Sequence, residues 1–119
     1  MSAKQKGCRG EREFAQLCKE HGYEEARRGQ QFCGGIDSPD VSGLPGIHIE
    51  CKRVEKLNIH EAMAQSIRDA AGQAIPIVAH RRNRDGWRIT MRAADWFKLY
   101  KAWERMKQDW TDEYGCKHQ

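Results

Sequence analysis

The chain has 119 residues, of which 39% are hydrophobic and 32% are charged, and its formal net charge is +4. It is too apolar for a disordered tail, and no apolar run approaches the ~20 residues of a membrane span. The mild basic excess is compatible with a nucleic-acid partner. Residues 1–13 lack the apolar stretch that a signal peptide needs, so we expect one cytoplasmic domain. The cysteines include no CxxC pair, which favours reduced thiols over a zinc site.

The first predicted elements are a helix and a short strand. Residues 7–21 are expected to form a helix that ends at Gly22. Its apolar stripe consists of Phe14, Leu17 and Cys18. A short strand is expected at 24–28, and the glycine-rich segment 29–35 is expected to be a mobile loop.

A hairpin and a second helix follow. Strands are predicted at 40–43 and 47–53, joined by the turn Leu44-Pro45-Gly46. A helix is predicted over 58–71, with Asn58 as its N-cap. Its apolar stripe consists of Ile59, Met63, Ile67 and Ala70.

The last elements are a buried strand at 74–80, a turn containing Asp85-Gly86, a strand at 87–91 and a helix at 95–110. The tail 111–119 is expected to be frayed. The last helix carries an apolar stripe at a/d spacing, formed by Trp96, Leu99, Trp103, Met106 and Trp110. This stripe either packs on the sheet or forms a dimer interface. Together the elements predict an α/β fold with a mixed sheet of about five strands flanked by helices.

The strand at 47–53 carries the strongest chemical signal. Because strand side chains alternate between faces, its isoleucines and Cys51 share an apolar face, whereas His48, Glu50 and Lys52 share the other. If the two strands pair as a hairpin, Asp40 reaches the face of Glu50. Two convergent carboxylates suit Mg²⁺ or Mn²⁺, and Lys52 beside them could orient water or stabilise charge on a phosphate.

These residues also have plainer interpretations. A Glu-x-Lys pair is common on any antiparallel sheet, and the preceding Pro39-Asp40, the flanking strands and the following helix are what favour a site. His48 could contact a metal or a phosphate, or be a partly exposed histidine with no catalytic role. Glu11 shares the apolar stripe of the first helix and so needs a partner, for which a metal or Lys52 would serve. Glu13 lies off the stripe and suits the helix dipole.

Basic residues gather at two places in the sequence. Five arginines lie between 81 and 92 with one acid, Asp85, and a second basic spot is Arg27-Arg28. The candidates for phosphate contacts are Arg27, Arg28, Arg81, Arg82, Arg84 and Arg88. The alternative for the first group is a solvated hairpin tip.

Three segments carry a family resemblance: 7–13 (GCRGERE), 39–41 (PDV) and 49–52 (IECK). They resemble the archaeal and phage-type Holliday junction resolvases of the PD-(D/E)XK nuclease superfamily, which act in DNA recombination and repair. The resemblance also touches 75–79 and 87–88, where such proteins carry later strands. It implies Mg²⁺, a homodimer and a mobile loop near the junction.

The resemblance also implies roles for individual residues. Glu11 corresponds to the family's helix glutamate, Asp40 and Glu50 to its metal carboxylates, and Lys52 to its catalytic lysine. Glu11 and the backbone carbonyl of Cys51 are further candidate metal ligands. The chain departs from the pattern at two positions. Asp37 is a rival carboxylate near Asp40, and Gln65 resembles a glutamine of related replication-repair nucleases, although its helical phase also suits exposure to solvent.

The sequence thus predicts a metal-dependent endonuclease that cuts DNA at four-way junctions. One rival is another PD-(D/E)XK restriction or repair nuclease acting on duplexes or flaps. The second rival is a DNA-binding module that kept the fold and lost the chemistry, and the intact set of Glu11, Asp40, Glu50 and Lys52 argues against it.

Overall fold

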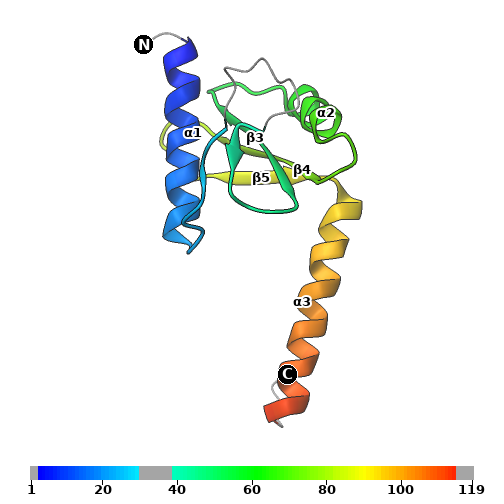
Figure 1. Ribbon diagram of the computed structural model, residues 1–119. Helices are drawn as coiled ribbons and strands as arrows, with labels where there is room; N and C mark the ends of the chain where they lie inside the picture. The colour runs from blue at the N-terminus through cyan, green and yellow to red at the C-terminus, as the bar shows by residue number, and fades with distance from the viewer. Residues whose placement is uncertain (1–2, 30–38, 115–119) are drawn as a thin grey trace.

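The computed structural model describes residues 3–29 and 39–114, with side chains for 8–29 and 39–110. Its elements are α1 (Ala3–Glu20), β1 (Arg27–Arg28), β2 (Val41–Ser42), β3 (Ile47–Arg53), α2 (Ile59–Ala70), β4 (Ile75–Arg81), β5 (Arg88–Met91) and α3 (Ala93–Tyr114). The fold is α/β with a five-stranded mixed sheet, which confirms the predicted class (Figure 1). Except for Gly29, the expected loop at 29–35 lies outside the described residues, as does Asp37.

The strands are ordered β1-β2-β3-β4-β5 across the sheet. β3 and β4 are parallel, and every other neighbouring pair is antiparallel. Parallel strands need a crossover connection, and α2 supplies it. The turn between β2 and β3 forms as predicted, because Ile47 N–H donates to the carbonyl of Leu44 at 3.1 Å. This tight hairpin fixes which residues of β2 and β3 lie side by side.

Different helices pack on the two faces of the sheet. Ile49 and Cys51 belong to the same core cluster as Phe14, Ala15 and Cys18 of α1. The alternate residues of β3 point the other way, toward α2. Helices α1 and α2 therefore cover opposite faces (Figure 1).

Of the predicted apolar stripe of α2, only Ala70 is buried, so the buried side of this helix was misplaced. The buried residues of this helix are Ala62, Ser66 and Ala70, whereas Met63 and Ile67 are only half-buried. Small residues on the inner side let the helix approach the sheet closely. Ser66 is tolerated there because its hydroxyl donates to the carbonyl of Ile77 at 2.9 Å.

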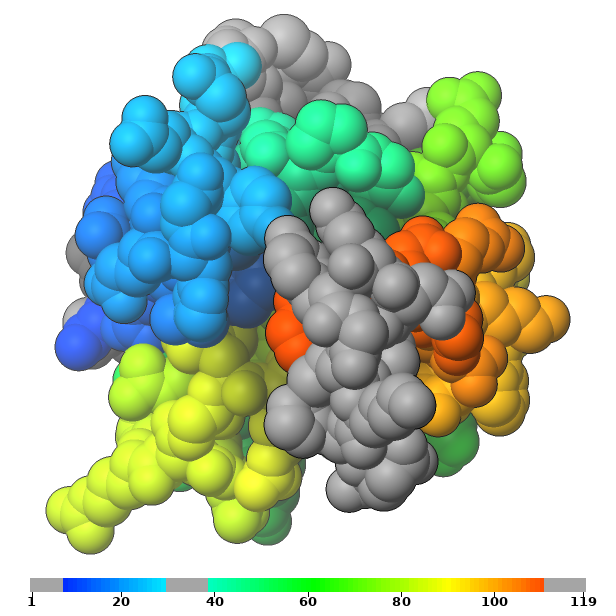
Figure 2. Space-filling view, turned by 90° about the horizontal axis from the view of Figure 1, so that it is seen from below, coloured from blue at the N-terminus to red at the C-terminus, as the bar shows by residue number. Residues whose placement is uncertain are grey.

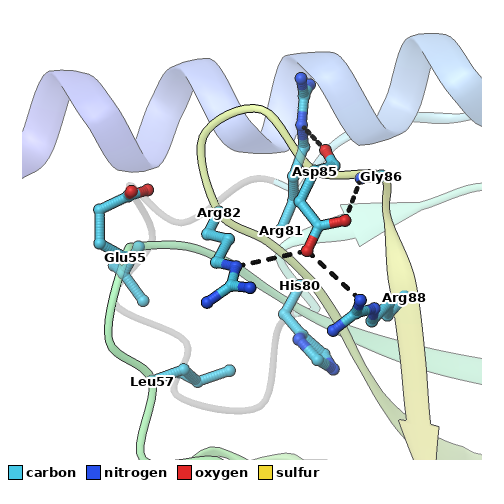
Figure 3. A pocket seen from close by; sticks show the side chains of 9 residues that line it. Glu55, Leu57, His80, Arg81, Arg82, Asp85, Gly86 and Arg88 are labelled. Atoms are coloured by element: carbon cyan, nitrogen blue, oxygen red, sulfur yellow. Dashed lines mark hydrogen bonds and ion pairs between the residues drawn. The ribbon is translucent and has the colours of Figure 1, made fainter.

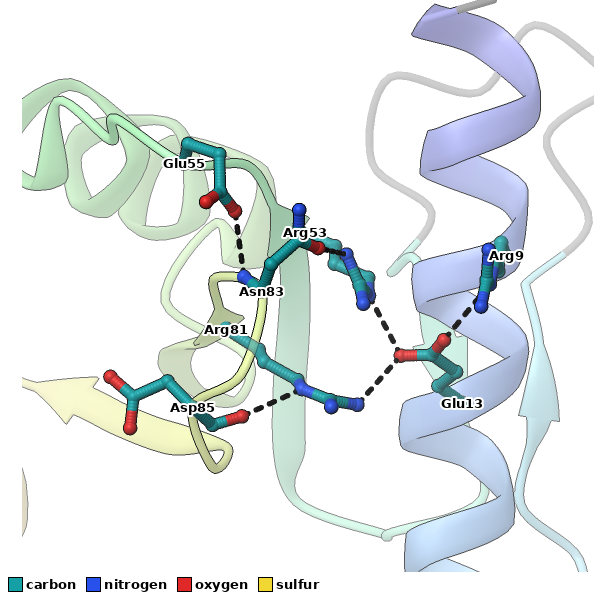
Figure 4. Close-up of polar contacts among 7 residues, drawn as sticks. All are labelled: Arg9, Glu13, Arg53, Glu55, Arg81, Asn83 and Asp85. Carbon is teal, nitrogen blue, oxygen red and sulfur yellow. Dashed lines mark hydrogen bonds and ion pairs between the residues drawn. The ribbon is translucent and has the colours of Figure 1, made fainter. Parts of the chain in front are cut away.

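A charged cluster ties α1 to the sheet (Figure 4). The carboxylate of Glu13 accepts from Arg9 Nε at 3.2 Å, from Arg53 Nε at 2.9 Å and from Arg81 Nη1 at 3.1 Å. Burial by itself raises the pKa of Glu13, but the hydrogen bond and charge of Arg53, with the charges of Arg81 and Arg9, hold the pKa below its ordinary value. Glu13 is thus a cross-link between α1, β3 and β4, a role beyond that of a helix-dipole acid.

We expect Glu13→Gln to lower the free energy of unfolding by about 1 kcal/mol at pH 7, since the side chain is part of a partly exposed charged network. The folded-state pKa is depressed, so this contribution is present above the ordinary value of 4.5 and is lost as the pH falls through the folded value. Thermal unfolding at pH 7 and pH 4 measures it. Glu20→Gln, an exposed change on the same helix, is the control. A Glu13→Gln deficit that is equal at both pH values would contradict the ionic explanation.

The last helix does not pack on the sheet. In Figure 1 α3 projects away from it, and in the view from below its orange residues lie on the flank opposite blue α1 (Figure 2). The radius of gyration is 16.5 Å, against about 13.5 Å for a compact domain of this length. Of the two uses predicted for the α3 stripe, packing on the sheet is therefore wrong.

Two further sequence predictions concern the tail and the thiols. The helix continues through Tyr114, because no glycine or proline interrupts it before Gly115, so residues 111–114 of the expected frayed tail are helical. Residues 115–119 lie outside the described part. The cysteines that the structure describes, Cys8, Cys18 and Cys51, are free thiols. None of the described helices is long and apolar enough to cross a membrane.

Candidate functional site

The β2–β3 hairpin brings Asp40 beside Glu50, as the sequence predicted. Val41 pairs with Ile49 in the antiparallel register, and Asp40 N–H donates to the Ile49 carbonyl at 2.8 Å. The Asp40 carboxylate accepts from Cys51 N–H at 2.8 Å. Asp40 is 9% exposed and Glu50 is 3% exposed. Two buried carboxylates are thus held next to one another by backbone pairing.

Lys52 and His48 flank Glu50 on the same strand face. Lys52 Nζ lies 3.9 Å from Glu50 Oε2, and His48 Nε2 lies 3.9 Å from Glu50 Oε1. The side chain of Lys52 is 32% exposed, whereas that of His48 is 5% exposed. The expectation of a partly exposed His48 is therefore wrong, because α2 covers this end of the face. Lys52 sits at the boundary between the buried carboxylates and solvent.

The structure adds Asp69 of α2, which the sequence analysis missed. One ligand atom from each of His48, Glu50 and Asp69 lies within 4.8 Å of the others, so these three residues can hold a metal ion. Asp69 is half-buried and directly precedes the buried Ala70. A carboxylate next to the buried side of a helix was a usable signal. It was overlooked because the helical phase was misplaced.

The carboxylates influence one another strongly. Burial, followed by the charge and hydrogen bond of Asp40, raises the pKa of Glu50 to about 8, although Lys52 acts in the opposite direction. The charge of Asp69 raises this pKa further. Buried carboxylates are stable only when a proton or a cation compensates their charge. The site is therefore electrostatically suited to a divalent cation.

The donor set fits more than one metal. Carboxylate oxygens are hard ligands that suit Mg²⁺, whereas an imidazole nitrogen favours transition metals such as Mn²⁺. The cluster of His48 with two carboxylates could hold a divalent cation, and its mixed ligands do not select Mg²⁺.

Glu11 is buried on α1, and it forms an ion pair with Arg28, whereas the sequence offered a metal or Lys52 as its partner. Arg28 Nε donates to Glu11 Oε1 at 2.9 Å, and Arg28 Nη2 donates to Cys8 Sγ at 3.1 Å. Arg28 pairs with Val41 in the sheet, and Val41 directly follows Asp40 in the sequence. The Glu11–Arg28 ion pair is therefore near Asp40. The structure thus groups Glu11 with a predicted phosphate-binding arginine.

The remaining predicted site residues lie on three elements. Gln65 is half-buried on α2, one turn before Asp69, which places the two on the same side of the helix. Cys51 contacts the site through its backbone N–H, and its thiol belongs to the α1 face. Arg27, on β1, is exposed.

The arginines of the β4–β5 hairpin differ in their partners. Arg81 is bound to Glu13 and to the Asp85 carbonyl, so its guanidinium is largely engaged within the molecule. Arg82 and Arg88 each lie 3.3 Å from Asp85 Oδ2, with their side chains 64% and 66% exposed. Arg84 is exposed at the tip.

The chain was compared with protein-family models, with curated protein sequences and with solved structures, and none of them matches it.

Proposed function

We propose that this protein is a divalent-metal-dependent DNA endonuclease that hydrolyses phosphodiester bonds, with four-way junctions as its preferred substrate. The proposal rests on one juxtaposition. The buried carboxylates of Asp40, which directly precedes β2, and of Glu50 on β3 lie side by side, with Lys52 beside them at the edge of solvent. The preference for junctions draws only on the resemblance of the three sequence segments to the resolvases.

Each residue has a distinct proposed task. Asp40 and Glu50 would hold a divalent cation, which supplies Lewis acidity and a more acidic bound water. His48 and Asp69, whose ligand atoms cluster with that of Glu50, would add further ligands. The Cys51 N–H keeps the Asp40 carboxylate oriented in the absence of DNA. Lys52 can reach a phosphate from its half-exposed position and stabilise negative charge that develops on it.

Metal binding can be tested without DNA. We expect Asp69→Asn to weaken Mn²⁺ binding about tenfold, as removal of a supporting carboxylate does at other metal sites. His48→Gln should weaken Mn²⁺ binding more than Mg²⁺ binding, because only the imidazole favours the transition metal. Isothermal titration of wild type and variants measures both effects, with the exposed Asp109→Asn as the control. Unchanged Mn²⁺ affinity in both variants would remove α2 and His48 from the site.

A second copy of the chain is the proposed partner of α3. Seven large apolar side chains of this helix are 40% to 60% exposed: Trp96, Phe97, Leu99, Tyr100, Trp103, Met106 and Trp110. Trp96 stacks on Tyr100, with ring centroids 5.3 Å apart, and Tyr100 lies 5.7 Å from Trp103. Five of the seven follow the a/d spacing by which helices pair.

The exposed area is of the size that a dimer requires. An aromatic side chain buries about 150–250 Å², so covering the exposed parts of these residues would remove about 600–700 Å² per copy. A standard interface buries about 800 Å² per partner. The whole chain exposes 8788 Å², against about 6600 Å² for a compact monomer of this mass. A dimer also presents two sites, which paired cuts in a two-fold symmetric junction need.

A panel of end-labelled DNA tests the substrate. We would incubate a four-way junction, a linear duplex and a flap with the protein and Mg²⁺ and compare initial rates. The proposal expects the junction to be cut fastest, at paired positions. Faster cleavage of duplex or flap would assign the chain to another nuclease role, and binding of all three without cleavage would favour a DNA-binding module.

A further inference from the structure

A small polar pocket opens between the loop that follows β3 and the β4–β5 hairpin (Figure 3). Its volume is about 160 Å³. Leu57 forms part of one wall, and Arg82 and Arg88 converge from two sides above His80 (Figure 3). Glu55, at the opposite rim, directs its carboxylate to the backbone N–H of Asn83 at 2.6 Å (Figure 4). The side of the pocket near Arg88 therefore presents mainly donors.

The Asp85 carboxylate occupies the point where these donors meet. Its Oδ1 accepts from Gly86 N–H at 2.9 Å, and its Oδ2 lies 3.3 Å from Arg82 Nε and 3.3 Å from Arg88 Nη2. A backbone N–H and two guanidinium groups on one oxyanion are the donors that proteins commonly offer to a phosphate. Because both arginine side chains are about two-thirds exposed, such ion pairs hold the carboxylate weakly and can exchange it for another anion.

The pocket lies on the same face of the sheet as the candidate active site. Lys52 pairs with His80 across the parallel strands, and His80 pairs with Arg88 across the next pair. Paired residues point to the same face, so the three form a row across β3, β4 and β5. Two strand spacings amount to about 10 Å, which corresponds to about three nucleotides of rise along a DNA strand.

We infer that this pocket is a subsite for a backbone phosphate of DNA, a few nucleotides from the bond at Lys52, and that Asp85 occupies it as an internal anion until the phosphate displaces it. The identity of the ligand as DNA rests on the proposed function. Asp85 holds Arg82 and Arg88 in position in the free protein and lowers the affinity for DNA, because the incoming phosphate must compete with it. The subsite also explains why a single acid stands among five arginines.

DNA binding in EDTA tests the subsite independently of cleavage. Fluorescence anisotropy would measure the affinity of wild type and variants for a labelled duplex and a labelled junction over a series of salt concentrations. Asp85→Asn is expected to bind about three- to fivefold more tightly than wild type. Asp85→Ser, which keeps a hydroxyl acceptor for Gly86 N–H, should do the same and guards against a distorted turn. The exposed Asp109→Asn controls for the change in net charge.

Variants of the two arginines, alone and combined with Asp85→Asn, form a mutant cycle that tests the competition. Arg82→Ala with Arg88→Ala should weaken binding and reduce the salt slope by about one phosphate contact. In the protein that lacks both arginines, Asp85→Asn should raise the DNA affinity no more than Asp109→Asn does. The guanidinium groups for which Asp85 and the phosphate compete are then absent. The inference is overturned if Asp85→Asn and Asp85→Ser match the Asp109→Asn control, or if the gain persists without the two arginines. Absence of cleavage with Mg²⁺ or Mn²⁺ would instead refute the proposed function and leave these binding results interpretable.

Discussion

Asp40→Asn is expected to reduce DNA cleavage about 10³-fold or more while DNA affinity stays within about threefold of wild type. The amide removes the negative charge of a proposed metal ligand, yet its oxygen can still accept from Cys51 N–H, so the β2–β3 hairpin should persist. Glu50→Gln should have the same effect on the rate. Initial rates with saturating Mg²⁺ and anisotropy in EDTA separate catalysis from binding.

A matched control defines what would count against this expectation. Glu25→Gln removes an exposed carboxylate in the segment that connects α1 to β1, and it should cut DNA at the wild-type rate. Circular dichroism should show that all three variants are folded. An Asp40→Asn protein that retains more than a tenth of the wild-type rate, while Glu25→Gln is unaffected, would mean that Asp40 does not hold the cation.

Trp103→Ala should weaken the proposed α3 dimer about 30-fold or more, because truncating a tryptophan anchor at the centre of an interface commonly costs ~2 kcal/mol. Trp103 lies in the middle of the α3 stripe and is 48% exposed. Sedimentation velocity across a concentration series measures the dissociation constant. Lys101→Ala, on another side of the same helix, is the control. Loss of the dimer should also uncouple the paired cuts in a junction.

The outcomes for the dimer separate two claims. A wild-type protein that remains monomeric at tens of micromolar, with and without junction DNA, would contradict both the dimer and paired cleavage. A stable dimer that tolerates Trp103→Ala would retain paired cleavage but move the interface away from α3.

Two local patterns, the alternation of β3 and the turn before it, were read correctly from the sequence. The alternation along 47–53 separated the core residues Ile49 and Cys51 from Glu50, and the Leu44-Pro45-Gly46 turn placed Asp40 beside that carboxylate. Both depend on backbone geometry that a few neighbouring residues determine.

Two features that depend on how helices pack were not predicted from the sequence. Asp69 joins His48 and Glu50 only because the small residues Ala62 and Ser66 turn that side of α2 toward the sheet. The exposure of α3 could not be predicted either. An apolar stripe indicates that a helix packs on something, but not whether that surface belongs to the same chain or to another.

Charge patterns likewise did not distinguish arginines with different partners. Arg28 and Arg81 were grouped with phosphate-binding residues, yet each forms an ion pair with a glutamate of α1, Glu11 in one case and Glu13 in the other. Those pairs join residues 17 and 68 positions apart in the chain. Local sequence does not reveal such distant pairing.

The central claim is that Asp40 and Glu50 support metal-dependent hydrolysis of DNA. Its most direct test is the incubation of wild-type protein with end-labelled four-way junction in Mg²⁺, in Mn²⁺ and in EDTA, with the Asp40→Asn variant alongside. We expect cleavage by the wild type with either metal, none in EDTA and none by the variant. Absence of cleavage with both metals, or cleavage that persists in EDTA, would contradict the claim.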